Sequence, residues 1–266
     1  MHDDLIHLGL IDEEDVVLDE AALALALLDH PETSRDFCLG VFRAIADRLA
    51  TIGADARDAR SQALLLAQVL GSEFGFIGDR VTYDDPANSD MVRVIERRQG
   101  LPVTLSILYV AAARRLGWTA NMLDVPGHVL VLVGEDVVPV MIDPFRGGEF
   151  VDRDQLVVLL QTMDPGRVAA TSHVATMSNR AILLRLLLNA ATRAEAGGEG
   201  RRALTLYQRM TVVAPGSGHG WWERARLELI GGNVAGTRMS LSAMLEVTRE
   251  PELRAKVSSI LTSLQA

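Results

Sequence analysis

The chain has 266 residues, which is enough for one large or two modest domains with a buried core. Hydrophobic residues make up 48% and charged residues 23%, as in an ordinary globular protein. The net charge of −9 argues against a nucleic-acid binder, which needs a basic face. The one cysteine, Cys38, excludes an internal disulfide and a cysteine-based zinc site.

The beginning of the chain, MHDDLIHLGLIDEED, is acidic where an export signal is basic. The most apolar stretches, LPVTLSILYVAAA and LVVLL, are shorter than the roughly 18 to 20 apolar residues that a membrane helix needs. We therefore predict a cytoplasmic protein with no membrane partner.

Residues 1–75 are predicted to be helical. Residues 18–28, LDEAALALALL, have Asp19 and Glu20 in the first turn, where acidic side chains interact favourably with the helix dipole. Two more helices are predicted over residues 34–51 and 54–73, the second from apolar side chains at helical spacing.

A turn-rich stretch, GFIGDRVTYDDPANSD, separates these helices from a very apolar one. Asn88 or Ser89 is placed to cap a short helix that continues to Arg98. Residues 101–113, which follow Gly100, contain no charged residue and are apolar all round the helical wheel. Such a helix has to be buried on most sides.

Two β-branched runs, HVLVLV and VVPVMI, predict a hairpin. If its loop consists of Glu135 and Asp136, His128 lies directly opposite Asp143 on the same face. A loop longer or shorter by one residue would shift the register and separate the two side chains. We expect an imidazole and a carboxylate to be neighbours on the hairpin.

The chain is again helical from about residue 176, with hairpins punctuated by GGEG, APGSG and GGN. The pattern of one hairpin recurs 34 residues later, which resembles a pair of degenerate tetratricopeptide repeats. An unrelated helical tail is the alternative. The recurring positions are Leu187, Ala191, Ala203, Tyr207, Met210 and Pro215, followed by Trp221, Ala225, Thr237, Leu241 and Met244, with no proline at the last position of the second repeat.

A buried helix with a glycine before it, followed by a hairpin with His and Asp, is the layout of papain-like and transglutaminase-like sites. The runs YDDPANSDMVRVIERRQGLPVTLSILYVAAARRLGW, DVPGHVLVLV and IDPFRGGEF resemble the bacterial SirB-type family of transglutaminase-like proteins. The resemblance implies an α+β fold: a transglutaminase-like (papain-like) core with a small antiparallel sheet and many helices. We expect residues 1–75 to form its helical part, 76–170 the rest of the core, and 176–266 the repeat-like helices.

By this resemblance the histidine and aspartate of the transglutaminase site fall on His128 and Asp143. The catalytic cysteine of active members lies two residues after the glycine at the helix start, here Gly100, and that position is Pro102. The SirB-type pattern itself has proline there. Because a proline ring offers no nucleophile, the thiol chemistry is missing.

Three other side chains are candidates to replace the thiol. Thr104 and Ser106 lie near the same helix end, but a hydroxyl needs a well-aligned base. Cys38 lies on a predicted helix, where a small buried hydrophobe is the commoner role of cysteine. The histidines have no metal-ligand spacing, so we expect no metal and no cofactor.

Polar residues just before the central helix are candidates for ligand binding. Arg97 or Arg98 could clamp a carboxylate or form an ion pair with Glu96. Asn88 could cap a helix or contribute to the cleft.

These observations support a non-catalytic transglutaminase-like protein that binds a peptide or protein partner through its cleft and repeat-like helices. The alternative is a hydrolase or acyltransferase in which His128 and Asp143 activate water, Thr104 or Ser106. A third possibility is an assembly role for the repeat-like helices alone, with His128 and Asp143 as a purely structural pair.

Overall fold

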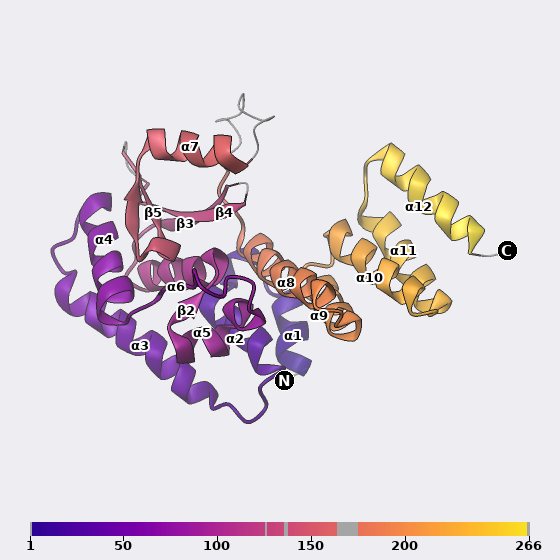
Figure 1. Ribbon diagram of the computed structural model, residues 1–266, viewed down its shortest axis with the longest axis horizontal. Helices are drawn as coiled ribbons and strands as arrows, with labels where there is room; N and C mark the ends of the chain where they lie inside the picture. Colours follow the sequence, from indigo (N-terminus) through magenta and orange to yellow (C-terminus); the bar gives the residue numbers. More distant parts are fainter. Residues whose placement is uncertain (1, 126, 136–137, 164–174, 265–266) are drawn as a thin grey trace. The chain divides into compact units, whose positions relative to one another are not determined.

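The computed structural model describes residues 2–125, 127–135, 138–163 and 175–264 (Figure 1). The chain divides into two compact units. One comprises Glu13–Ile182, and the other combines Met1–Asp12 with Leu183–Ala266. The domain limits expected from the sequence remain a prediction.

Three helices of the unit Glu13–Ile182 begin at polar caps. The Ser34 hydroxyl accepts a hydrogen bond from the Phe37 N–H, and the Asp58 carboxylate accepts one from the Ser61 N–H. Asp90, and not the expected Asn88 or Ser89, caps the short helix before the central one. The α-helices of this unit are α2 (Leu18–Leu27), α3 (Arg35–Ile52), α4 (Ala59–Leu66), which continues as a π-helical segment (Ala67–Glu73), α5 (Met91–Arg97), α6 (Pro102–Arg115) and α7 (Arg153–Met163).

Helix α6 is the centre of the core. Each side chain from Pro102 to Ala113 is buried, as its uncharged sequence predicts. Gly100 allows the chain to turn closely at the helix start, because a Cβ there would lie 2.6 Å from Oγ1 of Thr104. The start of α6 is therefore held tightly in one position.

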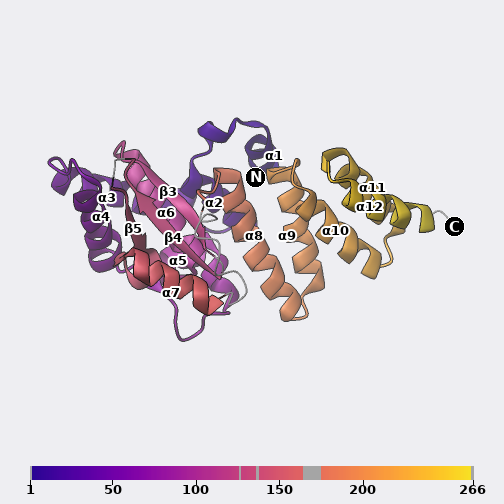
Figure 2. The same cartoon turned by 90° about the horizontal axis from the view of Figure 1, so that it is seen from above.

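A four-stranded antiparallel sheet covers α6 (Figure 2). Its strands follow chain order: β3 (Ala120–Val125), β4 (His128–Val133), β5 (Val140–Asp143) and β6 (Glu149–Val151). One face packs against Leu156 and Leu160 of α7, and α6 lies on the other side of the sheet. A second, parallel pair, β1 (Ile77–Gly78) with β2 (Gln99–Gly100), joins the turn-rich stretch to the start of α6.

The hairpin is confirmed, but its predicted register is wrong by two residues. Val133 pairs with Val140, so the loop is longer than the two residues assumed, and Leu130 is the residue that falls across from Asp143. A shift of two keeps every side chain on its face. His128 is thus a diagonal neighbour of Asp143, still within reach of it.

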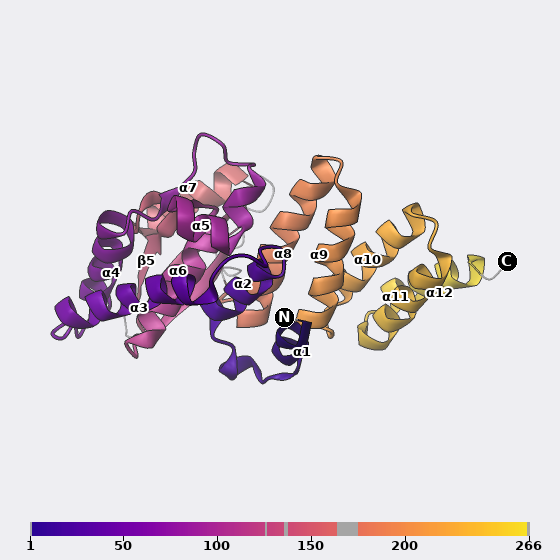
Figure 3. The same ribbon diagram turned by 90° about the horizontal axis from the view of Figure 1, so that it is seen from below.

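The other unit is made entirely of helices in its described residues (Figure 3). The N-terminal helix α1 (His2–Leu10) packs so closely on α9 that a Cβ at Gly9 would collide with the Val212 carbonyl. None of the described helices is long and apolar enough to cross a membrane. The remaining helices are α8 (Asn179–Ala196), α9 (Gly200–Val213), α10 (Gly218–Ile230), α11 (Val234–Val247) and α12 (Pro251–Ser263).

The helical hairpins α8–α9 and α10–α11 bury equivalent positions. Tyr207 and Met210 of α9 are buried, and so are Leu241 and Met244, which lie 34 residues further on. The sequence recurrence therefore coincides with recurring packing positions.

Candidate functional site

His128 and Asp143 form a hydrogen-bonded pair at the end of the sheet. Nε2 of His128 lies 2.9 Å from Oδ2 of Asp143, and the two side chains are 13% and 3% exposed. The other carboxylate oxygen of Asp143 accepts the backbone N–H of Phe145 at 3.0 Å. The carboxylate is therefore fixed from two sides and orients the imidazole, which is what an Asp–His pair needs for proton transfer.

Aromatic and phenolic groups enclose this pair. The Phe145 ring stands edge-on to the His128 ring, with 6.3 Å between centroids, and to the Tyr83 ring, with 5.8 Å. The Tyr109 hydroxyl is buried with no hydrogen-bond partner among the described residues. Burial, with a smaller contribution from the Asp143 charge, raises the pKa of Tyr109, so this phenol stays protonated.

A cleft with a cavity volume of about 610 Å³ opens beside His128. This volume lies within the range of ordinary ligand sites. The residues that line it are Arg80, Tyr83, Pro102, Gly127, His128, Phe145, Arg146, Glu149 and Leu159.

Pro102 lines the cleft at the N-terminal end of α6. A residue there combines the positive end of a buried helix with a nearby imidazole, a combination that lowers the pKa of a thiol. Pro102 supplies neither a thiol nor a backbone N–H. The cleft thus has an imidazole that is hydrogen-bonded to a carboxylate, and no nucleophile at position 102.

The two hydroxyls that could replace the thiol do not line the cleft. Oγ1 of Thr104 is fully buried and donates to the carbonyls of Asn88 and Leu101, both at 2.9 Å. Oγ of Ser106 is also fully buried, with no partner among the described residues. Neither hydroxyl is within the lining of the cavity that contains His128.

Asn88 and Arg97 belong to a buried polar cluster with Asp79. The Asn88 amide donates to Asp79 at 3.2 Å and to the Thr82 carbonyl at 2.7 Å. Arg97 donates to Asp79 at 3.1 Å and to Asn88 at 3.3 Å. We call Asp79, Thr82, Asn88 and Arg97 the Asp79 cluster; it fastens the turn-rich stretch to α5.

The electrostatics of the Asp79 cluster favour the ionised acid. The hydroxyl and N–H of Thr82 donate to the carboxylate and hold the pKa of Asp79 well below its usual range. Asp79 and Thr82 were not predicted from the sequence, because an Asp and a Thr inside a turn-rich stretch carry no distinguishing pattern. Glu96 pairs with Arg93 at 2.8 Å, not with Arg97 or Arg98.

Arg98 and Cys38 lie outside the cleft lining. Arg98 ends α5 in the left-handed region at φ 61°, and its guanidinium sits 4.6 Å above the Phe76 ring. Cys38 is buried on α3, and burial raises the pKa of its thiol. A buried cysteine with a raised pKa is poorly reactive.

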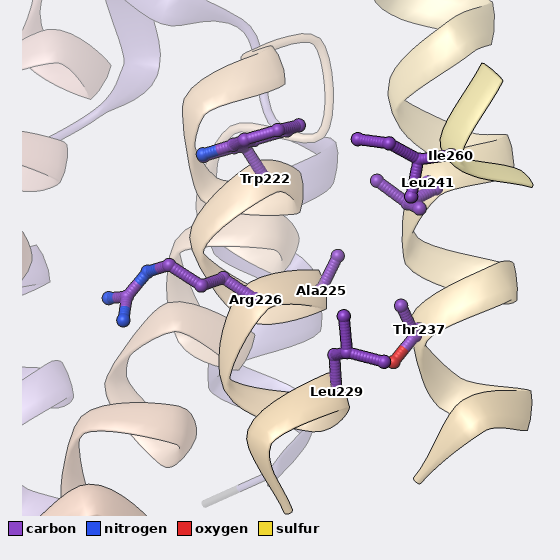
Figure 4. Close-up of a pocket in the computed structure, with 7 residues that line it drawn as sticks. All are labelled: Trp222, Ala225, Arg226, Leu229, Thr237, Leu241 and Ile260. Carbon is purple, nitrogen blue, oxygen red and sulfur yellow. The ribbon is translucent and has the colours of Figure 1, made fainter. Parts of the chain in front are cut away.

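A second, smaller pocket lies in the helical unit (Figure 4). Its cavity volume is about 120 Å³. The Arg226 guanidinium turns away from it and pairs with Glu195 at 2.6 Å, so the lining is mainly apolar. The lining residues are Trp222, Ala225, Arg226 and Leu229 of α10, Thr237 and Leu241 of α11, and Ile260 of α12.

Among the residues with assigned positions, no group of three or more His, Cys, Asp or Glu side chains could hold a metal ion.

Residues 39–188, more than half of the chain, match the family described as the transglutaminase-like superfamily. The chain belongs to this superfamily. The matched residues include Pro102 at the start of α6 and the bonded pair His128 and Asp143.

This chain is similar to bacterial proteins of the UPF0162 group. It is 27% identical over 247 residues to one from Xylella fastidiosa, covering 90% of this chain and 87% of that one. It is 31% identical over 199 residues to one from Vibrio cholerae, covering 71% and 72%. A shorter stretch of 63 residues is 36% identical to the F-box only protein 21 of Mus musculus, covering 24% of this chain and 10% of that protein.

Among solved structures, a crystal structure of menin aligns with this chain with a TM-score of 0.45 and 13% sequence identity. The alignment covers 91% of this chain and 69% of the menin chain.

Proposed function

We propose that this transglutaminase-like protein is non-catalytic and uses its cleft to bind a peptide or protein segment. The observation that carries the proposal is that Pro102 and His128 line one cleft of about 610 Å³. The nucleophile position is occupied by a side chain with no titratable proton, while the space for a chain segment is kept. The SirB-type sequence pattern, with proline at this position, supports the same conclusion.

The cleft walls suit a peptide. Tyr83 and Phe145 offer apolar ring surface, and Pro102 and Leu159 extend it. Pockets that bind ligands combine such apolar walls with a few directed polar groups. The His128 imidazole, fixed by Asp143, supplies one of these groups.

The test has a binding arm. The full chain is used to select binding peptides from a display library. The selected peptides should not bind the Leu159→Trp variant, because the larger side chain fills the cleft. Val158→Trp is the matched control, because Val158 is the exposed neighbour on α7 and does not line the cleft. If the Leu159→Trp and Val158→Trp variants bound the selected peptides equally well, the cleft would not be the binding site.

The test also has a catalytic arm. A screen of amide, ester and thioester substrates should give no turnover above background. Turnover that disappears in His128→Ala would overturn the non-catalytic proposal.

A second candidate function is a hydrolase or acyltransferase in which His128 activates a water molecule. The observation that favours it is the orientation of the imidazole by a carboxylate that is itself fixed by the Phe145 N–H. With Nε2 engaged by Asp143, the proton transfer falls to Nδ1. In this case Asp143→Asn would lower kcat far more than Thr104→Val, because the tautomer of His128 depends on the carboxylate.

We also propose that α8–α9 and α10–α11 are tetratricopeptide-like repeats that add a surface for a protein partner. The recurrence of buried positions at 34 residues supports this. Exchange of exposed side chains on α10 and α11, such as Met239→Glu, should weaken partner binding without changing peptide binding by the cleft. An unchanged partner affinity for several such variants would remove the surface role.

A further inference from the structure

Building on the proposed function, we infer that the segment bound in the cleft is acidic and that Arg80 and Arg146 bind one of its carboxylates. The chain as a whole carries a net charge of −9, yet the cleft lining contains two arginines and a histidine with a single acid, Glu149. The basic character of the lining thus runs against the charge of the chain.

The guanidinium of Arg80 forms no ion pair with another residue in the described part of the chain. It is exposed, it lines the cleft, and no acidic side chain with an assigned position lies within ion-pair distance of it. Its neighbour Asp79 is directed into the Asp79 cluster, where it is bonded by Thr82, Asn88 and Arg97. Arg80 therefore offers its guanidinium to the cleft.

Arg146 is the second cation of the cleft. Its side chain is 53% exposed, and its Nε lies 3.5 Å from Oδ2 of Asp143, too far for a good hydrogen bond. That oxygen already contacts His128 at 2.9 Å. Arg146 thus keeps donors for a ligand, and a guanidinium can bind a carboxylate through two parallel hydrogen bonds.

The apolar part of the lining favours a carboxylate that belongs to a peptide. A carboxylate accepts two parallel hydrogen bonds from a guanidinium, and a peptide presents it among other side chains. The apolar walls at Tyr83, Phe145 and Leu159 then accept the neighbouring side chains of the segment, which points to a peptide with Asp or Glu among apolar residues.

The experiment measures binding of a fluorescein-labelled peptide, with Glu between Leu and Phe residues, to the full chain by anisotropy. A matched peptide has Gln in place of each Glu. We expect the Glu peptide to bind about tenfold more tightly than the Gln peptide, and Arg80→Gln or Arg146→Gln to remove most of that difference. Arg43→Gln, on α3 outside the cleft, is the charge-matched control and should leave the affinity unchanged.

Three outcomes would overturn the inference, and they separate it from the proposed function. Equal affinity for the two peptides, lost in Leu159→Trp, would remove the acidic preference and leave a peptide-binding cleft. Displacement of the Glu peptide by inorganic phosphate at lower concentration than by glutarate would assign the arginines to phosphate instead. If the Leu159→Trp variant bound the Glu peptide as tightly as the parent does, the cleft would not be the binding site. Both proposals would then be wrong.

Discussion

Pro102 and His128 line the same cleft, Pro102 at the N-terminal end of α6 and His128 at the start of β4. The imidazole is oriented by Asp143, whereas the residue at the helix start carries no reactive atom. Whether this imidazole can act on a thiol at position 102 is open to direct test.

The most direct test is to introduce a thiol at position 102. In a Cys38→Ala background, Pro102→Cys would place a thiol at the positive end of α6 and beside His128, so its pKa should fall below the ordinary value of about 8.5. We expect iodoacetamide to alkylate it at pH 7 about tenfold faster than a free thiol. Addition of His128→Ala should slow the reaction, as measured by mass spectrometry. A rate indifferent to His128 would show that the ring does not act on this position.

The buried hydroxyls of α6 should differ in their effect on stability. Thr104→Val removes a donor to two backbone carbonyls and should lower the free energy of unfolding by about 1–2 kcal/mol. Ser106→Ala removes a hydroxyl with no partner among the described residues and should be neutral or slightly stabilising. Urea denaturation of both variants checks the contrast. If the Ser106 variant lost more than the Thr104 variant, an unrecognised polar partner would have to serve Ser106.

The Asp79 cluster predicts a loss of stability in acid. Because hydrogen bonds from Thr82 lower the pKa of Asp79 in the folded chain, its contribution is fully present above the unfolded pKa of about 3.9. It is lost as the pH falls through that value toward the lower folded pKa. Asp79→Asn should therefore flatten the dependence of the urea midpoint on pH below about 4. Parallel curves for the parent and the variant would contradict the assignment.

The glycines before β6 provide a matched pair. Both have positive φ, 70° at Gly147 and 87° at Gly148. A Cβ at Gly147 would have no atom within 4 Å, whereas one at Gly148 would lie 2.6 Å from the Cβ of Ala67. We expect Gly147→Ala to cost about 1 kcal/mol from backbone strain and Gly148→Ala to cost more, since strain and overpacking add. Thermal unfolding should rank them in this order, and the reverse order would contradict the packing at Ala67.

The parts of the fold that depend on local patterns could be predicted from the sequence. A long helical run without charge is stable only when it is buried, and this property alone places α6 in the core. The β-branched runs likewise identified β4 and β5. Three strands were not predicted. Ile77–Gly78 and Gln99–Gly100 are too short to show periodicity, and β3 contains Asn121 and Asp124, which are rare in strands.

The candidate site was predicted only where local pattern and resemblance agreed. The pairing of His128 with Asp143 is confirmed although the assumed loop was too short, because an error of two residues preserves the face of a strand. Arg80 and Tyr83 were not identified as cleft residues, since their positions depend on the long-range pairing of β1 with β2. Asn88, a candidate for a helix cap or for the cleft, and Arg97, a candidate for a carboxylate clamp or an ion pair, both belong to the Asp79 cluster.

The close packing of α1 on α9 has a consequence for biosynthesis. During synthesis α1 emerges before α9, so its contact with Val212 can form only after the chain has been translated that far. The segment that forms the cleft is synthesised in between, and domains generally fold as units as they emerge. We therefore expect the cleft of the nascent chain to form before α1 packs on α9.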